Sequence, residues 1–168
     1  MRPARAGSSD GRTAGLTMDS PSEAAPAALI GVRHQLRLSA IPMRTQPSFP
    51  LTHSYFEVVY APILGPSAVL VARHLARVLE AEDEPATICP ATLALELGLR
   101  SNNEDPLGRR SRLRRAIDRL DPHHLARWFD DQHLGVVSAA PAVSTRTRDT
   151  LPPLARQAHD RFLEVIDL

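Results

Sequence analysis

The chain of 168 residues carries 20 basic and 19 acidic side chains, a net charge of +1, and is 43% hydrophobic with only 4% aromatic residues. Its single cysteine excludes a disulfide framework and a cysteine-rich zinc site, and no apolar run approaches the roughly 20 residues that cross a bilayer. The N-terminus also lacks the apolar core of a signal peptide. We therefore expect one cytoplasmic domain, with a small aliphatic core and a tail.

The basic side chains are unevenly distributed. All of them are arginine, and this bias, together with abundant alanine and proline, indicates a GC-rich bacterial genome. Residues 100–127 contain eight arginines against four acidic side chains, whereas residues 54–99 contain two against six. A protein of almost no net charge can therefore present a basic face to an anionic partner. The alternative is that these arginines only keep a helix face solvated.

The sequence divides into three parts. Residues 1–50 are rich in glycine, serine, proline and alanine, and their composition predicts a disordered N-terminal tail. Residues 51–140 carry the periodic apolar patterns of a folded domain. Residues 141–168 combine a polar connector with an amphipathic helix, whose apolar stripe should be buried against its own domain or against a second copy. The stripe consists of Leu151, Leu154, Ala155, Ala158, Phe162 and Val165.

Two helices are expected at the start of the domain. Ser54 and Glu57 have the spacing of a capping box, and apolar side chains follow at helical intervals until Pro62 kinks or ends the helix. Pro66 suits the first turn of a second helix, and an apolar stripe continues from there to about Glu82. This second helix would be the first of a three-helix core.

A short strand and another core helix follow. The segment Ala86–Cys89 favours a strand, and Pro90 suits the start of a helix with Leu93 and Leu97 on its buried face. Gly98 is expected just after this helix, where a left-handed turn favours a residue without a Cβ.

Residues 110–120 form the most informative segment. Their apolar members fall at i, i+3, i+4 and i+7, on one side of a helix, and the arginines spread over the opposite side. The helix should end near Asp121, because Pro122 disfavours a helical predecessor. The apolar members are Leu113, Ala116, Ile117 and Leu120.

A hairpin is expected after this helix. Residues 125–137 predict two short strands around the polar turn Asp130–Gln132. Trp128, the only tryptophan, is expected to anchor this hairpin to the core rather than to contact a ligand.

Three segments together resemble the winged helix-turn-helix transcription regulators of bacteria: Leu93–Leu99 (LALELGL), Ser111–Leu120 (SRLRRAIDRL) and Leu125–Val137 (LARWFDDQHLGVV). The resemblance covers residues 66–137, and the ordered chain is also similar to small uncharacterised actinobacterial proteins. It implies a mainly α (α+β) fold, with a winged-helix domain over residues 51–140 that has a three-helix core and a short β-hairpin wing. Extra N- and C-terminal helices would be added to this core. In that family the helix after the turn enters the major groove of DNA and the wing touches the neighbouring backbone.

The resemblance also implies a function and a set of contacts. The protein would bind duplex DNA as a transcriptional regulator, as a homodimer through its terminal helices that matches the two-fold symmetry of such operators. Arginine suits this task because its planar fork donates two hydrogen bonds to phosphate or guanine. The first candidates for DNA contact share one helix face: Arg112, Arg115 and Arg119. Contacts to the DNA backbone are expected from Arg109, Arg110 and Arg114, and a contact from the wing is expected from Arg127. Ser111 would either donate a hydrogen bond to DNA or cap the helix.

One departure from the family concerns the turn between the two helices. The family has a few residues there, whereas the ten residues Arg100–Arg109 separate the two segments here. If Asp105 and Pro106 begin the next helix early, the gap becomes shorter. If they do not, the helix pair is splayed, and contacts to phosphates are better supported than contacts to bases.

Other functions find less support in the sequence. His123, His124 and His133 lie near the hairpin and Cys89 lies elsewhere, but their spacing does not define a metal site, so we expect no metal and no cofactor. The chain has no nucleophile elbow, phosphate-binding glycine loop or dinucleotide fingerprint, so we do not expect an enzyme. The alternatives that stay open are a winged-helix module that binds another protein, and a replication or partition accessory that binds DNA without regulating transcription.

Overall fold

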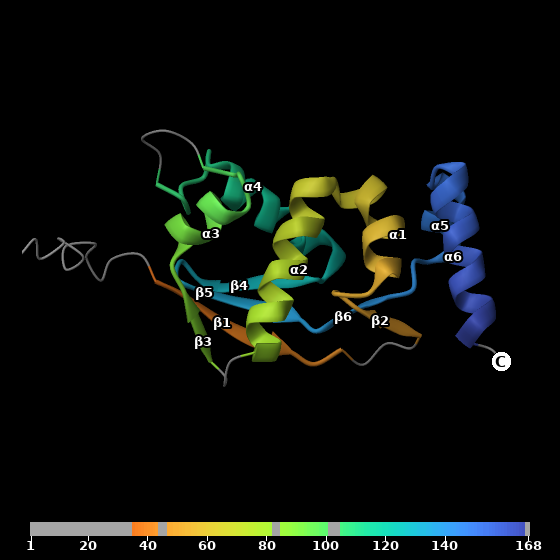
Figure 1. Ribbon diagram of the computed structural model, residues 1–168, viewed down its shortest axis with the longest axis horizontal. Helices are drawn as coiled ribbons and strands as arrows, with labels where there is room; N and C mark the ends of the chain where they lie inside the picture. Colours follow the sequence, from red (N-terminus) through yellow and green to blue (C-terminus); the bar gives the residue numbers. More distant parts are fainter. Residues whose placement is uncertain (1–34, 44–46, 82–84, 101–104, 167–168) are drawn as a thin grey trace, which may run out of the picture. The chain divides into compact units, whose positions relative to one another are not determined.

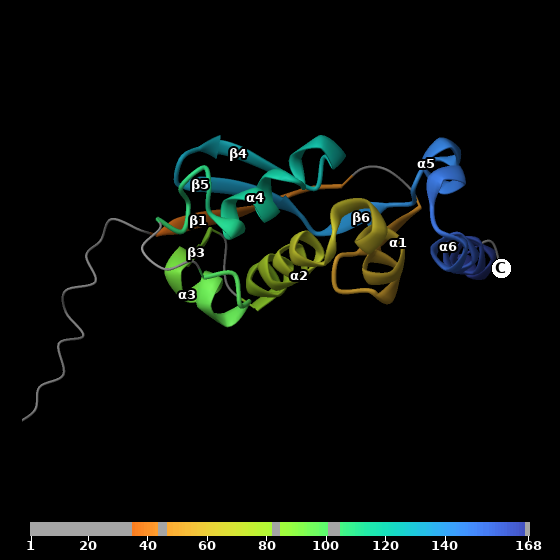
Figure 2. The same cartoon turned by 90° about the horizontal axis from the view of Figure 1, so that it is seen from above.

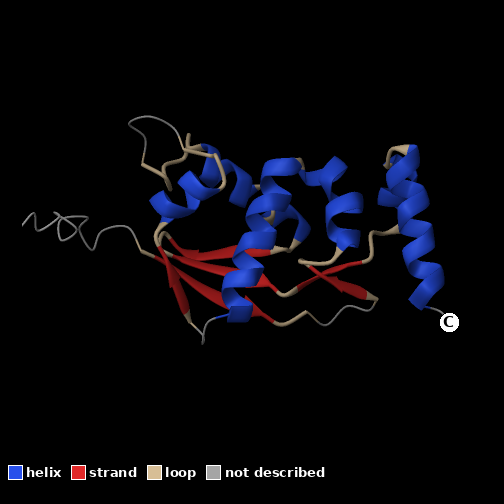
Figure 3. Cartoon of the chain, viewed as in Figure 1, coloured by secondary structure: helices blue, strands red, loops and turns tan. Residues whose placement is uncertain are grey.

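Helices and strands are both prominent in the computed structural model, which describes residues 35–166 with gaps at 44–46, 82–84 and 101–104. The described part is a mixed α and β structure, as the predicted α+β class requires (Figures 1 and 3). Its strands are β1 (Leu36–Ile41), β2 (Ser48–Pro50), β3 (Ala86–Ile88), β4 (Ala126–Asp130), β5 (His133–Val137) and β6 (Ala139–Pro141). Its helices are α1 (Ser54–Leu64), α2 (Pro66–Ala81), α3 (Pro90–Glu96), α4 (Arg112–Asp118), α5 (Thr145–Thr150) and α6 (Pro153–Ile166), with a 3₁₀ turn at Asp121–His123. Among these helices, none has the length and apolar character needed to cross a membrane.

The main sheet has four strands in the order β3-β1-β5-β4. β1 lies in the interior, antiparallel to β3 and parallel to β5, with Leu38 opposite Leu134. β4 and β5 form the expected antiparallel hairpin, which has an irregular register between Trp128 and Asp130. β2 and β6 form a separate antiparallel pair.

Helices cover one face of the main sheet. Leu36 and Leu38 of β1 are fully buried, whereas Arg37 between them is exposed, so alternate side chains of β1 point to the core and to solvent. α2 packs against β1 and β5, and α1 packs against α2 (Figure 2). The core between the helices and the sheet is mostly aliphatic, but it also contains Phe49, Tyr55, Phe56 and Tyr60, so the expectation of an aliphatic core is correct only in part.

The tail and the connector are more ordered than the sequence predicts. Disorder over residues 1–50 is wrong for Leu36–Ile41 and Ser48–Pro50, which are strands; residues 1–34 lie outside the described residues. β1 and β2 pair with strands close to the C-terminus, and such distant partners leave no signal in the local composition. The connector likewise contains α5, whose first turn is capped by the Ser144 hydroxyl.

The start and end of α1 differ from the expected capping box and proline break. His53, not Ser54, is the N-cap, and its Nδ1 accepts the Tyr55 N–H at 3.0 Å. The helix continues through Pro62 to Leu64 and ends at Gly65. Gly65 has φ 82° and ψ 155°, a backbone conformation that is nearly reserved for glycine, and it redirects the chain into α2.

The helices around the long turn are shorter than expected. α3 ends as the glycine predicts: Gly98 has φ +66° and Leu99 turns back into the core. Asp105 and Pro106 do not begin α4; their segment forms turns, and the helix starts at Arg112 and ends at Asp118, before the 3₁₀ turn. The turn between α3 and α4 is therefore long, as the sequence indicates, and an early start of α4 does not shorten it.

α6 is anchored to α1 through a buried polar contact. His159 is 3% exposed, and its Nδ1 lies 2.9 Å from the hydroxyl of Tyr55, which also accepts the Val143 N–H at 3.0 Å. The contact joins α6 to α1 and to the segment at Val143 through one tyrosine hydroxyl. Only part of the apolar stripe is buried on its own domain: Leu154 and Val165 are 79% and 72% exposed, because the helix packs through the side around Ala155 and His159. Burial of these two side chains against a second copy stays a prediction.

We expect the domain to lose stability as the pH falls below the ordinary histidine pKa of about 6.5. Burial lowers the pKa of His159, with Asp160 opposing and Arg148 reinforcing the shift, so the unfolded chain takes up a proton at a higher pH than the folded chain does. The loss continues until the lowered pKa is reached. Urea unfolding of the wild type and of His159→Gln, each at neutral and mildly acidic pH, measures the effect. The variant should lose part of the pH dependence, and an unchanged dependence would contradict this role of His159.

Candidate nucleic-acid interface

α4 has one buried and one exposed side, as its sequence predicts. Leu113, Ala116 and Ile117 are at most 4% exposed and pack in the core, where α4 contacts α2. Arg112, Arg115 and Arg119 are exposed on the other side. The core contacts therefore fix which arginines face solvent.

The three arginines line one concave surface. A hollow of about 540 Å³ lies between α4, the start of α2 and the end of α3. Ser67, the second residue of α2, and Gly98, just after α3, contribute to its wall. The sequence predicts where these two helix ends lie in the chain but not that both border a hollow beside α4, because their positions in space depend on the tertiary fold.

The electrostatics of this hollow favour an anion. Within the described ranges, no carboxylate oxygen lies within 4.0 Å of the guanidinium nitrogens of Arg112, Arg115 or Arg119. The start of α2, a helix of 16 residues, adds partial positive charge from its unpaired N–H groups at Ser67. A phosphate is the group that this combination suits best.

Two of the arginines are also held by the backbone. The Arg119 Nη1 donates to the carbonyl of Leu64 at 3.3 Å and lies 2.9 Å from the position that a Cβ on Gly65 would occupy. The Arg115 Nε donates to the carbonyl of Ser111 at 3.4 Å. Each contact uses one N–H group of the guanidinium, so Arg115 and Arg119 both keep further N–H groups that can donate to a ligand.

Ser111 serves the helix itself. It is 4% exposed, its Oγ accepts the Arg114 N–H at 2.9 Å and it donates to the carbonyl of Pro106 at 2.6 Å. The single hydroxyl proton is thus used, and the side chain is covered. Of the two roles expected for Ser111, the structure supports the helix cap, and we leave this residue out of the interface.

Arg114 joins α4 to the hairpin. Its Nε donates to Asp118 Oδ1 at 2.9 Å, the same oxygen accepts the indole N–H of Trp128 at 3.0 Å, and the guanidinium carbon lies 4.1 Å from the centre of the indole ring. The expectation that Trp128 anchors the hairpin is confirmed. Arg114 therefore has a structural task that Arg112 and Arg115 do not share.

We expect Arg114→Ala to lower the free energy of unfolding by about 1 kcal/mol, because it removes an exposed cation–π contact and an i,i+4 ion pair. Its effect on DNA affinity should be much smaller than that of Arg115→Ala. Urea unfolding and a DNA titration of both variants measure the two quantities. An affinity loss equal to that of Arg115→Ala would place Arg114 in the interface.

The remaining candidates do not all share this surface. Arg109 and Arg110 are exposed in the turn just before α4 and can extend its basic side. Arg127 is exposed on β4 next to Trp128, and because neighbouring side chains of a strand point to opposite faces, it points away from α4. The structure thus brings Arg112, Arg115 and Arg119 together and separates Arg127 from them.

Comparison with models of protein families, with curated proteins and with solved structures found no match to this chain. Within the part of the chain that the structure describes, no three histidine, cysteine or acidic side chains are grouped so that they could hold a metal ion. The arginine-lined hollow beside α4 is therefore the feature that points to a function.

Proposed function

We propose that the protein binds duplex DNA through Arg112, Arg115 and Arg119, and that it acts as a transcriptional regulator in the bacterial cytoplasm. One observation carries the proposal: three exposed guanidinium groups line one hollow, beside the positive end of α2, without a carboxylate near them in the described residues. Phosphates of a DNA backbone match this charge and this hydrogen-bonding capacity.

In this proposal the segment from α2 to β5 is a winged-helix unit. The order α2, β3, α3, α4 and the β4–β5 hairpin supports this interpretation, as do the packing of α4 on α2 and the attachment of the hairpin through Trp128. α4 then lies against the DNA, with Arg109 and Arg110 reaching the adjoining backbone. The long turn before α4 favours phosphate contacts over base contacts, and Arg115 is the candidate for a guanine.

We also propose that the protein dimerises through α6. The apolar side chains Leu154 and Val165 are exposed on this helix, and a second copy could cover them. Such a dimer would present two α4 helices to two half-sites of a symmetric operator. Sedimentation of the wild type and of Leu154→Glu tests the dimer independently of DNA binding.

The deciding experiment is a titration of labelled random-sequence duplex DNA across a series of salt concentrations. If several phosphates are contacted, the logarithm of the affinity should fall linearly with the logarithm of the salt concentration, with a slope that reflects several released counterions. Absent or salt-independent binding at low salt would contradict the proposal and favour the alternative, a module that binds another protein. The titration does not separate a transcriptional regulator from a replication or partition accessory, and mapping the bound sites in the genome does.

A further inference from the structure

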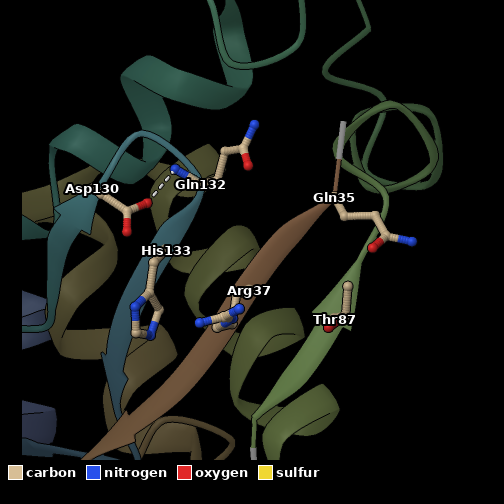
Figure 4. Close-up of a pocket in the computed structure, with 6 residues that line it drawn as sticks. All are labelled: Gln35, Arg37, Thr87, Asp130, Gln132 and His133. Atoms are coloured by element: carbon tan, nitrogen blue, oxygen red, sulfur yellow. Dashed lines mark hydrogen bonds between the residues drawn. The ribbon is translucent and has the colours of Figure 1, made fainter. Parts of the chain in front are cut away.

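The face of the main sheet opposite the helices carries a row of polar side chains. Arg37 of β1 pairs with Thr87 of β3 on one side and with His133 of β5 on the other, so these three residues stand side by side across three strands (Figure 4). They point away from the core, because Leu36 and Leu38 on the same strand point into it. This face is distinct from the arginine-lined hollow beside α4.

The row borders a cavity of about 350 Å³ at the end of the β4–β5 hairpin. Two of its walls are held in place by hydrogen bonds: Asp130 Oδ1 accepts the Gln132 N–H at 2.8 Å, and His133 Nε2 lies 2.9 Å from the hydroxyl of Ser39. Arg37 has no carboxylate oxygen within 4.0 Å among the described residues, so its guanidinium is available to a ligand. The cavity thus offers a cation, hydroxyl and amide donors, and one carboxylate in a fixed position.

An exposed aromatic ring lies next to this cavity. Phe129, at the irregular position of β4, is 53% exposed, and its ring centre lies 4.8 Å from that of His133. The side chain of Phe129, from β4, lies over Gly135 of the neighbouring strand β5. A Cβ at Gly135 would come within 2.7 Å of the phenyl ring. The backbone of β5 therefore supports the ring from one side, and the exposed part is free for stacking.

We propose that this open face binds an unpaired nucleotide, with the base stacked on Phe129 and the phosphate held by Arg37. Thr87 adds a hydroxyl donor to the phosphate, while Asp130 can accept from an amino or hydroxyl group of the base or sugar. A simple carboxylate ligand would account for Arg37 but would leave the exposed ring unused. Stacking on an aromatic side chain next to a basic contact to the backbone is how single strands are held without base pairing. The proposal does not rest on duplex binding by α4.

The test uses the full chain and two probes: a short labelled oligodeoxythymidylate, which does not pair with itself, and thymidine monophosphate. We expect Phe129→Leu and Arg37→Gln each to weaken binding of the oligonucleotide by about fivefold or more in fluorescence anisotropy. Phe129→Tyr keeps the ring and should bind nearly as the wild type does. If the mononucleotide binds with the same dependence on both residues, the ligand is a free nucleotide; if only the oligonucleotide binds, it is a strand.

Matched controls separate this surface from the one on α4. Arg77→Gln removes an exposed arginine from α2, on the helical side, and should leave binding of the oligonucleotide unchanged. Arg115→Ala should weaken duplex binding without affecting the single strand. The proposal is overturned if the wild type binds neither probe at low salt. It is also overturned if Phe129→Leu and Arg37→Gln bind the oligonucleotide as the wild type does, or if Arg115→Ala alone abolishes that binding.

Discussion

Replacing Arg112 and Arg115 together with alanine is expected to weaken binding to duplex DNA about hundredfold at low salt, since a hydrogen bond to a charged group contributes about 1.5–3 kcal/mol. The slope of affinity against salt should fall by about two, one for each lost phosphate contact. Both side chains are exposed, and neither is joined to another side chain in the described structure, so the fold should survive. Arg119 is left in place because it donates to the Leu64 carbonyl.

A second double variant serves as the control for this experiment. Arg77→Ala combined with Arg146→Ala removes the same amount of charge from exposed positions on α2 and α5. Its affinity should stay within a few fold of the wild type, because these arginines do not line the hollow beside α4. Equal losses in the two double variants would show that overall charge, and not this face, governs binding. The assignment of the interface to α4 would then be wrong.

Ile117→Asp is expected to unfold most of the protein at room temperature. Ile117 is 1% exposed and lies in the core beneath α4, so the substitution removes an aliphatic side chain and leaves a carboxylate without a partner. A buried, unpaired charge costs several kcal/mol, which is comparable to the whole stability of a typical domain, about 5–15 kcal/mol. Circular dichroism and thermal unfolding measure the change.

The matched control is Ile117→Val, which keeps the site apolar and should cost about 0.5–1.5 kcal/mol. Because protonation removes the charge, Ile117→Asp should recover part of its structure in mild acid, where the wild type is slightly weakened through His159. Cooperative melting of Ile117→Asp near the wild-type temperature would contradict the observed register of α4.

The features that follow from neighbouring residues could be predicted from the sequence. The apolar spacing of α4 set its buried side, a glycine after α3 marked the left-handed turn, and a polar turn marked the β4–β5 hairpin. β1 could not be predicted, because only Leu36 and Leu38 alternate with polar residues and the partner strand β5 is far along the chain. Composition alone assigned these residues to a disordered tail.

In the candidate site, too, only the features that depend on neighbouring residues could be predicted from the sequence. The sequence identified the arginine-bearing side of α4, but it could not separate Arg114 from Arg115, since that difference depends on Trp128 from another element. It also could not predict that the start of α2 would lie beside Arg112, or that Phe129 and Arg37 would share the open face of the sheet. These arrangements are set by tertiary contacts between distant segments.

The position of β1 limits how the protein can be divided. The segment from α2 to β5 contains the proposed DNA-contacting helix, yet it lacks the strand that joins β3 to β5. A fragment that starts at Pro66 would leave both strands with unpaired backbone groups and the core without Leu36 and Leu38. During synthesis, β1 is made before β5, so the pairing of β1 with β5 cannot form until most of the chain has been made. The segment from α2 to β5 is therefore not expected to fold when it is separated from β1. A shortened version of the protein would need to begin before Leu36 to fold.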